Sequence, residues 1–390
     1  MSKLPVTWIK SSLNDVCNVV NGGTPKTGVD SYWGGKHYWV TPAEMGKRSN
    51  PYISETRRKL TNDGLGNTSA KLVPPFSVIL STRAPIGHLV INKVPMAFNQ
   101  GCRGLVPNDD LNYRFLYYFL MNSISLLNDL GTGATFKELS AGKLKAVNIP
   151  VPPLQEQQRI VSILDKAFES IDQAIASTEK NLANARELFE SYLNNVFTQK
   201  GKGWVEVSLS DVCQLISGQH IDSKDYNIIK KGIGYLTGPS DFGLINPVVS
   251  KWTEHPKRTA LLNDILVTVK GSGVGKANLM THGELAISRQ LMAIRSNEVN
   301  IKLLYRFIKT RYSYFQSLAN GAAIPGISRP DVLGLTLSLP KRSLQNELAI
   351  KIDNIANEVD NLDEVYKKKI FSLNELKQSL LQKAFSGQLS

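Results

Sequence analysis

The stretch LQEQQRIVSILDKAFESIDQAIASTEKNLANARELFESYLNNVF, residues 154–197, decides the architecture of this chain. Its apolar and small residues return every three or four positions, as on one side of an α-helix. This seam comprises Ile160, Leu164, Ala167, Ile171, Ala174, Thr178, Leu182, Ala185, Phe189, Tyr192 and Val196. Prolines at 150, 152 and 153 precede the segment and glycines at 201 and 203 follow it. The pattern predicts one long helix with a coiled-coil seam.

A second segment of the same character lies between Pro340 and Gly387. Its seam comprises Leu348, Ile352, Ile355, Val359, Leu362, Tyr366, Ile370, Leu373, Leu376, Leu380 and Ala384. Each helix would be on the order of 60 Å long, too long for the interior of one ordinary domain. We expect the two helices to pair antiparallel, because two segments of one chain meet at a high effective concentration. Two separate dimerisation helices are the alternative.

An internal repeat precedes both helices. Trp8, Leu13, Asp15, Val16 and Cys17 recur with identical spacing as Trp204, Leu209, Asp211, Val212 and Cys213. Looser matches join 38–46 to 235–243, 115–120 to 303–308, 133–140 to 321–328, and the pair Leu154-Gln155 to Leu344-Gln345. The chain is therefore predicted to be two copies of one unit, each a globule followed by a long helix.

Each globule is predicted to be mixed α/β (α+β), with a twisted sheet. β-like segments at 77–82, 88–92, 265–269 and 335–339 are broken by Gly, Pro and Asn. Helical patterns occupy 113–121 and 301–309, and short helices are expected at 137–142 and 328–334. The predicted domain boundaries are 1–152 and 201–341 for the globules and 153–200 and 342–390 for the helices.

Charge and cysteine content restrict the class of protein. The chain has 390 residues and a formal net charge of +13, from 46 Lys and Arg against 33 Asp and Glu, which favours a polyanionic partner. Three cysteines without metal-ligand spacing argue against a disulfide framework and a zinc cluster. No signal core and no long apolar run is present, so we expect a cytoplasmic protein without a membrane span.

The predicted geometry suits duplex DNA. A chain ordered globule, helix, globule, helix, with its helices antiparallel, relates its halves by a pseudo-twofold axis and turns two basic globules to the same side. Dimeric repressors read two half-sites about 34–36 Å apart in this way. Because the two globules differ in sequence, the two half-sites should differ as well.

These features resemble the DNA specificity (S) subunit of type I restriction-modification systems. The resemblance covers essentially the whole chain and rests on the domain order and three motifs: Gly22-Gly23-Thr24-Pro25, Gly133-Ala134-Thr135, and IPVPPLQEQQRI at 149–160. The second copy departs from it, with Gly321-Ala322-Ala323, Leu344-Gln345-Asn346-Glu347 and no Gly-x-Thr-Pro after Cys213.

The resemblance implies a division of labour. Residues 1–152 and 201–341 would be target-recognition domains, each reading one half of a bipartite, asymmetric DNA target. The helices would set the spacer and dock two methyltransferase (M) subunits, and restriction (R) subunits would join the full complex. S-adenosylmethionine, ATP and Mg are expected on those partners, with no cofactor and no metal in this chain.

Candidate DNA-binding residues lie in polar loops of both copies. Asn and Gln can pair with adenine and Arg with guanine, whereas Lys, Ser and Thr suit phosphates. The candidates are Lys26, Thr27, Ser81, Thr82, Arg83, Asn99, Gln100 and Arg103 in the first copy, and Gln219, Lys270, Ser272, Lys276, Arg289 and Gln290 in the second. In the second copy, Lys270, Ser272 and Lys276 are matched to Ser81, Thr82 and Arg83. Lys36, His220, Lys224, Lys230 and Lys231 also lie in segments suited to backbone contacts. The alternative for these residues is an ordinary role in turns and caps.

Residues at the starts of the long helices are candidates for docking the M subunits under this resemblance. They are Gln155, Glu156, Gln157, Arg159, Gln345 and Glu347. Favourable electrostatics at a helix end is the alternative explanation.

Catalytic motifs are incomplete. Gly271–Lys276 resembles a phosphate loop, but Lys270 stands where the Walker pattern needs glycine. Val73-Pro74-Pro75-Phe76 resembles the Asn-Pro-Pro-Phe loop of adenine methyltransferases, yet Val73 cannot hydrogen-bond a target amino group. No Glu-x-Lys follows Pro330-Asp331 at a distance useful to a nuclease. We therefore expect a non-catalytic DNA-binding subunit; a protein-interaction scaffold with basic globules is the main alternative, and a methyltransferase in its own right is a third.

Overall fold

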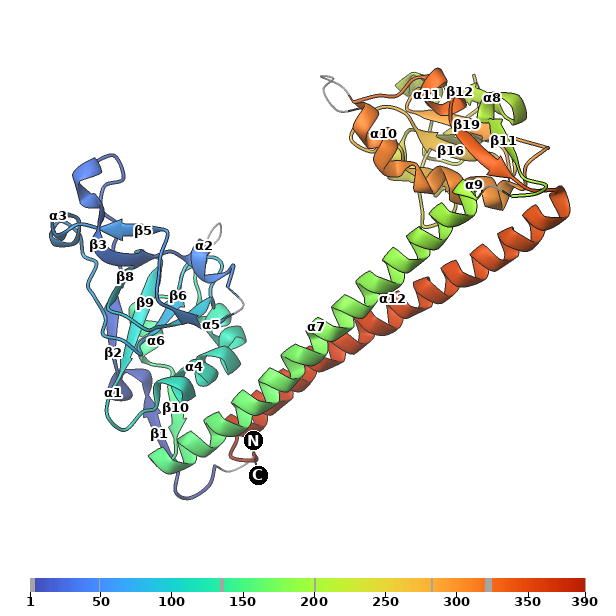
Figure 1. Cartoon of the computed structure of the whole chain (residues 1–390). Coiled ribbons are helices and arrows are strands. Elements are labelled where there is room, and N and C mark those ends of the chain that lie inside the picture. The colour runs from blue at the N-terminus through green and yellow to red at the C-terminus, as the bar shows by residue number, and fades with distance from the viewer. Residues whose placement is uncertain are drawn as a thin grey trace. The chain divides into compact units, whose positions relative to one another are not determined.

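The computed structural model describes residues 4–48, 50–133, 137–199, 201–281, 283–319 and 325–389. Two compact units make up the chain (Figure 1). Unit 1 comprises residues 1–177 and 368–390, and unit 2 comprises residues 178–367. Each unit therefore holds one globule together with part of each long helix.

Unit 1 begins with short elements that alternate between strand and helix. Its strands are β1 (Ile9–Ser12), β2 (Cys17–Asn21), β3 (Trp33–Val40), β4 (Tyr52–Ile53), β5 (Arg58–Leu60), β6 (Val78–Ser81), β7 (Leu89–Asn92), β8 (Met96–Phe98), β9 (Cys102–Pro107) and β10 (Asn148–Val151). Its helices are α1 (Leu13–Val16), η1 (Asp30–Tyr32), α2 (Pro42–Met45), α3 (Asn62–Gly66), α4 (Tyr113–Asn122), α5 (Ile124–Leu130) and α6 (Ala141–Lys145). The long helix α7 (Leu154–Thr198) follows.

The strands of unit 1 form three sheets. The largest has the order β2-β9-β6-β7-β4, a second has the order β5-β3-β8, and β1 pairs with β10. In the second sheet β3 is antiparallel to β5 and parallel to β8. Helix α4 packs on the largest sheet, where Phe115 and Leu116 are fully buried.

Unit 2 repeats this plan. Its strands are β11 (Val205–Ser208), β12 (Gln214–Ser217), β13 (Ile233–Leu236), β14 (Trp252–Thr253), β15 (Thr259–Ala260), β16 (Ile265–Thr268), β17 (Ala277–Leu279), β18 (Leu285–Ile287), β19 (Leu291–Arg295) and β20 (Thr336–Leu339). Its helices are α8 (Leu209–Val212), η2 (Ser223–Asp225), η3 (Pro239–Asp241), α9 (Ile301–Thr310), α10 (Tyr312–Ala319) and α11 (Arg329–Leu333), and α12 (Arg342–Phe385) closes the chain.

Sheet topology confirms the internal repeat. The sheets of unit 2 have the orders β12-β19-β16-β17 and β14-β13-β18-β15, with β11 paired to β20. Strand β13 is antiparallel to β14 and parallel to β18, as β3 is to β5 and β8. Strand β15 adds an edge to this sheet, where unit 1 has only an isolated bridge between Val73 and Met96.

Helices α7 and α12 pair antiparallel within each unit, as predicted. In unit 1 they lie side by side (Figure 1), with an ion pair between Asp172 and Lys377 and a 2.6 Å hydrogen bond from Arg159 Nη2 to the carbonyl oxygen of Leu389. In unit 2 Arg186 forms an ion pair with Asp363. The pairing occurs within one chain, so the alternative of two separate dimerisation helices is not needed.

The seam of α12 differs from the prediction at two positions. Leu362 and Leu376 are 37% and 46% exposed. The neighbouring side chains Asp363 and Lys377 are 18% and 19% exposed and form the ion pairs with α7. Charged pairing therefore replaces apolar packing at these two turns.

The C-terminal end of each long helix completes a globular core. Phe385 of α12 lies in the core of unit 1, with ring centroids 5.0 Å from Phe115 and 5.5 Å from Phe119. Phe197 of α7 lies in the core of unit 2, with its ring centroid 5.3 Å from that of Phe307. The core of unit 1 therefore includes residues more than 200 positions away in the sequence, whereas the core of unit 2 is built from the continuous stretch 178–367.

Most predicted elements are confirmed, including β6, β7, β16, β20, α4, α9 and both long helices. The short helix expected at 137–142 is α6, which begins later, because Ser140 caps it by accepting a 3.3 Å hydrogen bond from the N–H of Lys143. Glu138 instead lies in extended backbone bridged to Thr132. Part of the Gly133-Ala134-Thr135 motif and all of 321–323 lie outside the described residues. No helix in the described part of the chain could cross a membrane.

Candidate nucleic-acid interface

Two glycines bring equivalent backbone segments close together in the two units. A Cβ atom on Gly22, after β2, would lie 2.1 Å from the carbonyl oxygen of Asn99. A Cβ atom on Gly218, after β12, would lie 2.1 Å from the carbonyl oxygen of Ser288. Only glycine permits this approach. Gly218 therefore takes the place of the first glycine of the Gly-x-Thr-Pro motif, which the second copy otherwise lacks.

Asn99 stabilises the turn that follows β8. Its Nδ2 donates a 2.9 Å hydrogen bond to Thr24 Oγ1, and its Oδ1 accepts a 2.7 Å hydrogen bond from the N–H of Gly101. The side chain is half-buried and both ends of the amide are used, so the predicted contact with adenine is not available in this arrangement. The neighbouring side chain of Gln100 is exposed.

Two arginines flank this turn in unit 1. Arg83 follows β6, is exposed and forms a 3.0 Å ion pair with Glu138. Arg103, in β9, donates hydrogen bonds from Nη1 to the carbonyl oxygens of Gln100 (3.0 Å) and Cys102 (2.9 Å). Partial burial lowers the pKa of the Arg103 guanidinium. Arg83, Gln100 and Arg103 together form what we call the polar rim of unit 1.

Ser81 and Thr82 have structural roles, which corrects their prediction as DNA contacts. Both side chains are fully buried. Ser81 Oγ donates to the carbonyl oxygen of Pro85 and accepts from the N–H of His88, each at 2.8 Å. Thr82 Oγ1 donates to the carbonyl oxygen of Gly101 at 3.3 Å. Buried hydroxyls bonded to backbone groups cannot reach a nucleic acid.

Backbone hydrogen bonds show which residues of unit 2 correspond to those of this region in unit 1. The N–H of Val269 donates to the carbonyl oxygen of Gln290 at 2.8 Å, as the N–H of Thr82 donates to that of Gly101 at 2.7 Å. Lys270 therefore corresponds to Arg83 and Arg289 to Gln100. The predicted match of Lys270, Ser272 and Lys276 to residues 81–83 was wrong, because positions 81 and 82 correspond to the buried residues 268 and 269.

Lys270, Arg289 and Gln290 form the polar rim of unit 2, and all three are exposed. The side-chain amide of Gln290 lies against Gly238, where a Cβ atom would be 2.1 Å from Oε1. The N–H of Gln219 donates a 2.9 Å hydrogen bond to the carbonyl oxygen of Ile287, which places Gln219 beside this rim. Its side chain is exposed.

The remaining candidates are exposed. Those on loops are Lys26 and Thr27 before η1, Ser272 and Lys276 between β16 and β17, and His220, Lys230 and Lys231, whereas Lys36 lies in β3 and Lys224 in η2. Lys276 borders a cavity of about 310 Å³ together with Lys309 and Tyr312.

Arg58 is a further exposed cation that the sequence reasoning missed. Its guanidinium carbon lies 3.3 Å from the centroid of a Trp33 ring, so the two side chains stack. The alternation of basic and aromatic residues around β3 and β5 was the available signal. The stack presents a planar cation on the surface of unit 1, beside the loop that carries Lys26.

Gln157 and Gln345 clamp each long helix to its globule. Gln157 is fully buried; its Oε1 accepts from the N–H of Asn112 at 2.8 Å and its Nε2 donates to the carbonyl oxygens of Asp110 and Pro152 at 2.8 Å. Gln345 makes the same bonds to the N–H of Asn300 (2.9 Å) and the carbonyl oxygen of Pro340 (3.0 Å).

These clamps correct two predictions. Both glutamines are buried and occupied within their own units, so they are not docking residues in this structure. Gln345 corresponds to Gln157 and not to Gln155, so the match of the two Leu-Gln pairs was shifted by two residues. Of the other candidates, Gln155 and Glu347 are exposed, and Arg159 forms a 2.8 Å ion pair with Glu156.

Comparison with known proteins decides the family. The model of the family described as type I restriction modification DNA specificity domain matches residues 5–183 and 201–370. The chain belongs to this family. Each match takes in one globule and most of the helix that follows it, which agrees with the repeat seen in the structure. Membership of this specificity family also favours a DNA-specificity subunit over a protein-interaction scaffold.

Relatives of this specificity family resemble the chain along its length. It is 26% identical to the type I restriction enzyme MjaIX specificity subunit of Methanocaldococcus jannaschii over 421 aligned positions, covering 100% of this chain and 95% of that protein. A solved structure from a study of complex assembly and conformational transition of the type I R-M system matches with a TM-score of 0.85 and 22% identity, over 100% of both chains. The crystal structure of the HsdS subunit from Thermoanaerobacter tengcongensis matches with a TM-score of 0.63 and 22% identity, over 99% of this chain and 98% of that one. At these identities the two structures show a shared fold.

Replacing Gln157 by Leu should destabilise unit 1. The change removes the hydrogen-bond partner of the half-buried Asn112 N–H and of the carbonyl oxygens of Asp110 and the buried Pro152, and a buried unpaired polar group costs about 1–3 kcal/mol. We expect the free energy of unfolding of unit 1 to fall by about 3 kcal/mol, measured by urea denaturation. Gln158→Leu, at the exposed neighbouring position, is the control; equal stability of the two variants would contradict the clamp.

Proposed function

We propose that this chain is the sequence-specific DNA-binding subunit of a type I restriction-modification complex. The globule of each unit reads one half of a bipartite, asymmetric target on double-stranded DNA. The observation that carries this proposal is the duplicated polar rim: Arg83 and Gln100 in unit 1 stand where Lys270 and Arg289 stand in unit 2. The same scaffold thus presents two different sets of exposed hydrogen-bonding side chains.

The difference between the rims predicts unlike half-sites. Gln100 can pair bidentately with adenine, whereas Arg289 at the equivalent position suits guanine, and each good pair is worth about 1–3 kcal/mol of discrimination. The basic side chains near the rims, such as Lys26 and Lys276, would hold the phosphates and fix the register. Base identity comes from the rims, and affinity comes largely from the surrounding charge.

The partners follow from the same proposal. Two M subunits dock on the long helices, which also set the spacer between the half-sites, and R subunits join the full complex. Exposed Gln155 and Glu347, with the Glu156 and Arg159 pair, remain candidates for that docking surface. We assign no catalytic step and no cofactor to this chain; S-adenosylmethionine, ATP and Mg belong to the partners, and the proposed location of the complex is the cytoplasm.

An exchange of globules tests the proposal. Residues 1–152 are replaced by the corresponding segment of another family member, and the chain is assembled with its M subunits. We expect methylation to require a new first half-site and the original second half-site. Unchanged methylation of the original target would refute readout by this globule. Binding that shows no preference for one duplex over scrambled DNA, at several salt concentrations, would instead favour a scaffold.

A further inference from the structure

The loop between η2 and β13 of unit 2 presents two isoleucines to solvent. Ile228 and Ile229 are 77% and 76% exposed. Lys230 and Lys231 follow them directly and are exposed as well. Adjacent large aliphatic side chains on a surface mark a contact site when the backbone holds them outward.

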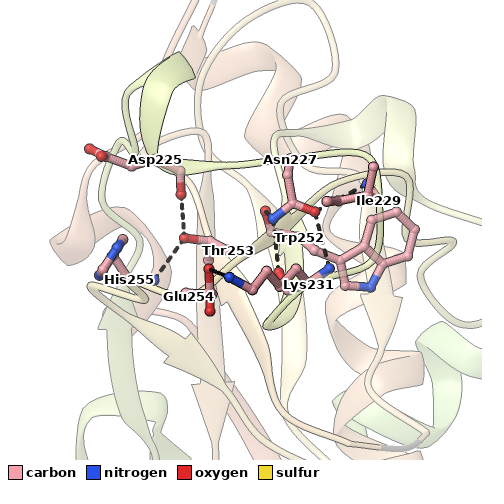
Figure 2. A network of polar contacts seen from close by, with 8 residues as sticks. All are labelled: Asp225, Asn227, Ile229, Lys231, Trp252, Thr253, Glu254 and His255. Carbon is pink, nitrogen blue, oxygen red and sulfur yellow. Dashed lines mark hydrogen bonds and ion pairs between the residues drawn. The ribbon is translucent and has the colours of Figure 1, made fainter.

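Asn227 holds the base of this loop, as Figure 2 shows. Its Oδ1 accepts hydrogen bonds from the N–H groups of Ile229 and Lys231, each at 3.1 Å. Its Nδ2 donates to the carbonyl oxygens of Lys231 at 2.8 Å and Trp252 at 3.1 Å. The backbones of Asn227 and Trp252 exchange two further hydrogen bonds, of 2.7 and 2.8 Å. One side chain thus ties both ends of the loop to strand β14.

Further contacts fix the direction of the loop. Lys230 has a φ of +63° and Gly232 a φ of +90°, both in the left-handed region. A Cβ atom on Gly232 would lie 2.1 Å from the carbonyl oxygen of Thr253, so the chain passes very close to β14 there. Lys231 also forms a 3.0 Å ion pair with Glu254, drawn in Figure 2. These contacts therefore hold the turn that carries the two isoleucines in one conformation.

The charge around the isoleucines is positive. Segments 222–231 and 251–258 carry six basic residues, Lys224, Lys230, Lys231, Lys251, Lys257 and Arg258, against three acidic ones, Asp222, Asp225 and Glu254. Lysine is depleted in the cores of protein–protein interfaces, whereas it is the usual partner of phosphates. The surroundings therefore fit a nucleic acid better than a protein surface.

The loop and the polar rim of unit 2 belong to one sheet. The loop precedes β13, and Arg289 follows β18, which runs parallel to β13. The loop and the rim therefore lie at opposite ends of this sheet, and a four-residue strand spans roughly 13 Å. Contact of one half-site with both features requires the duplex to extend along the direction of the strands.

We propose that Ile228 and Ile229 insert into the minor groove of the half-site bound by unit 2 and wedge between stacked base pairs, with Lys230 on the adjacent phosphate. Inserted aliphatic side chains unstack a base step and bend the duplex. The inference rests on the proposed function. It applies to one half-site, because the equivalent loop before β3 carries a single aliphatic residue, Val29, which is half-buried.

The test uses the full chain assembled with its M subunits and a duplex selected with that complex from a random pool. The fluorescent base 2-aminopurine, which brightens when unstacked, is placed at each position of both half-sites in turn. The base methylated in each half-site is left out, because methyltransferases flip their target base out of the stack. At the other positions we expect brightening at one or two adjacent positions of the second half-site only. The double change Ile228→Ala with Ile229→Ala should abolish this signal and weaken binding about tenfold, with an unchanged salt dependence, since no charge is removed.

Two variants make the result specific. Leu244→Ala removes a side chain that is 98% exposed on another loop of unit 2, and should change neither signal nor affinity. Lys230→Ala should keep the signal while reducing the slope of log affinity against log salt by about 0.9.

The failures are distinguishable. Tight sequence-specific binding without brightening outside the methylated bases, or brightening there that survives the double isoleucine change, rejects insertion and leaves the specificity function intact. Loss of M subunits by the double variant in the absence of DNA would make the loop a protein contact and also rejects insertion. A complex with no sequence preference refutes the proposed function, and the insertion with it.

Discussion

Changing Phe385 to Ala should destabilise unit 1 by about 3–5 kcal/mol, the usual cost of removing a buried phenylalanine side chain. Phe385 is 8% exposed and packs edge-on against Phe115 and Phe119 of α4. Amide exchange in α4 should become faster, while α9 of unit 2 keeps its protection. Chemical denaturation followed by hydrogen exchange would measure both effects.

Phe371→Ala is the matched control on the same helix. Phe371 is 67% exposed, and surface substitutions usually change stability by less than about 0.5 kcal/mol. The equivalent variant of unit 2, Phe197→Ala, should make amide exchange faster in α9 while α4 stays protected. A loss of less than 1 kcal/mol for Phe385→Ala, relative to Phe371→Ala, would show that the end of α12 is not part of the unit 1 core.

Changing Gly22 to Ala should disrupt the polar rim of unit 1. The new Cβ atom would lie 2.1 Å from the carbonyl oxygen of Asn99 and 2.8 Å from a ring carbon of Phe98. Backbone on one side and a buried ring on the other leave it no room, so the turn that carries Gln100 must move. We expect a loss of about 1–3 kcal/mol or more in the stability of unit 1, and loss of discrimination at the first half-site in a duplex competition assay.

Gly28→Ala supplies the control, because a Cβ atom there meets nothing within 4 Å. Gly218→Ala tests the same idea in unit 2 and should affect the second half-site only. Normal discrimination at the first half-site by the Gly22→Ala variant would mean that the rim does not read that half-site.

The sequence predicted the long helices and the repeat well for a physical reason. Both helices bury one narrow side against the other, so apolar residues must return with helical period, and this period is visible in a single sequence. The repeat was visible because equivalent capped turns need equivalent residues: Asp15 accepts a 3.1 Å hydrogen bond from the N–H of Ser12, and Asp211 accepts one of 3.3 Å from that of Ser208.

The candidate site was predicted less accurately, because burial and hydrogen-bond partners are not visible in the sequence. Ser81 and Thr82 lay at the end of the predicted strand at 77–82 and were still taken as DNA contacts, yet Ser81 bonds to Pro85 and His88 and Thr82 bonds to Gly101. The correspondence between the starts of α7 and α12 was predicted wrongly, because the two similar Leu-Gln pairs are not structurally equivalent. The shared pattern is a glutamine five residues after a proline, Pro152 to Gln157 and Pro340 to Gln345.

The burial of Phe385 in the core of unit 1 affects how the chain folds while it is being synthesised. Unit 2 is one continuous stretch, residues 178–367, whereas the core of unit 1 needs Leu381, Phe385 and Leu389. During synthesis the globule of unit 1 must therefore stay partly open until residues 381–389 have been made. Domains commonly fold in the order in which they emerge from the ribosome. Here unit 2, whose globule is made second, has all of its residues before unit 1 does.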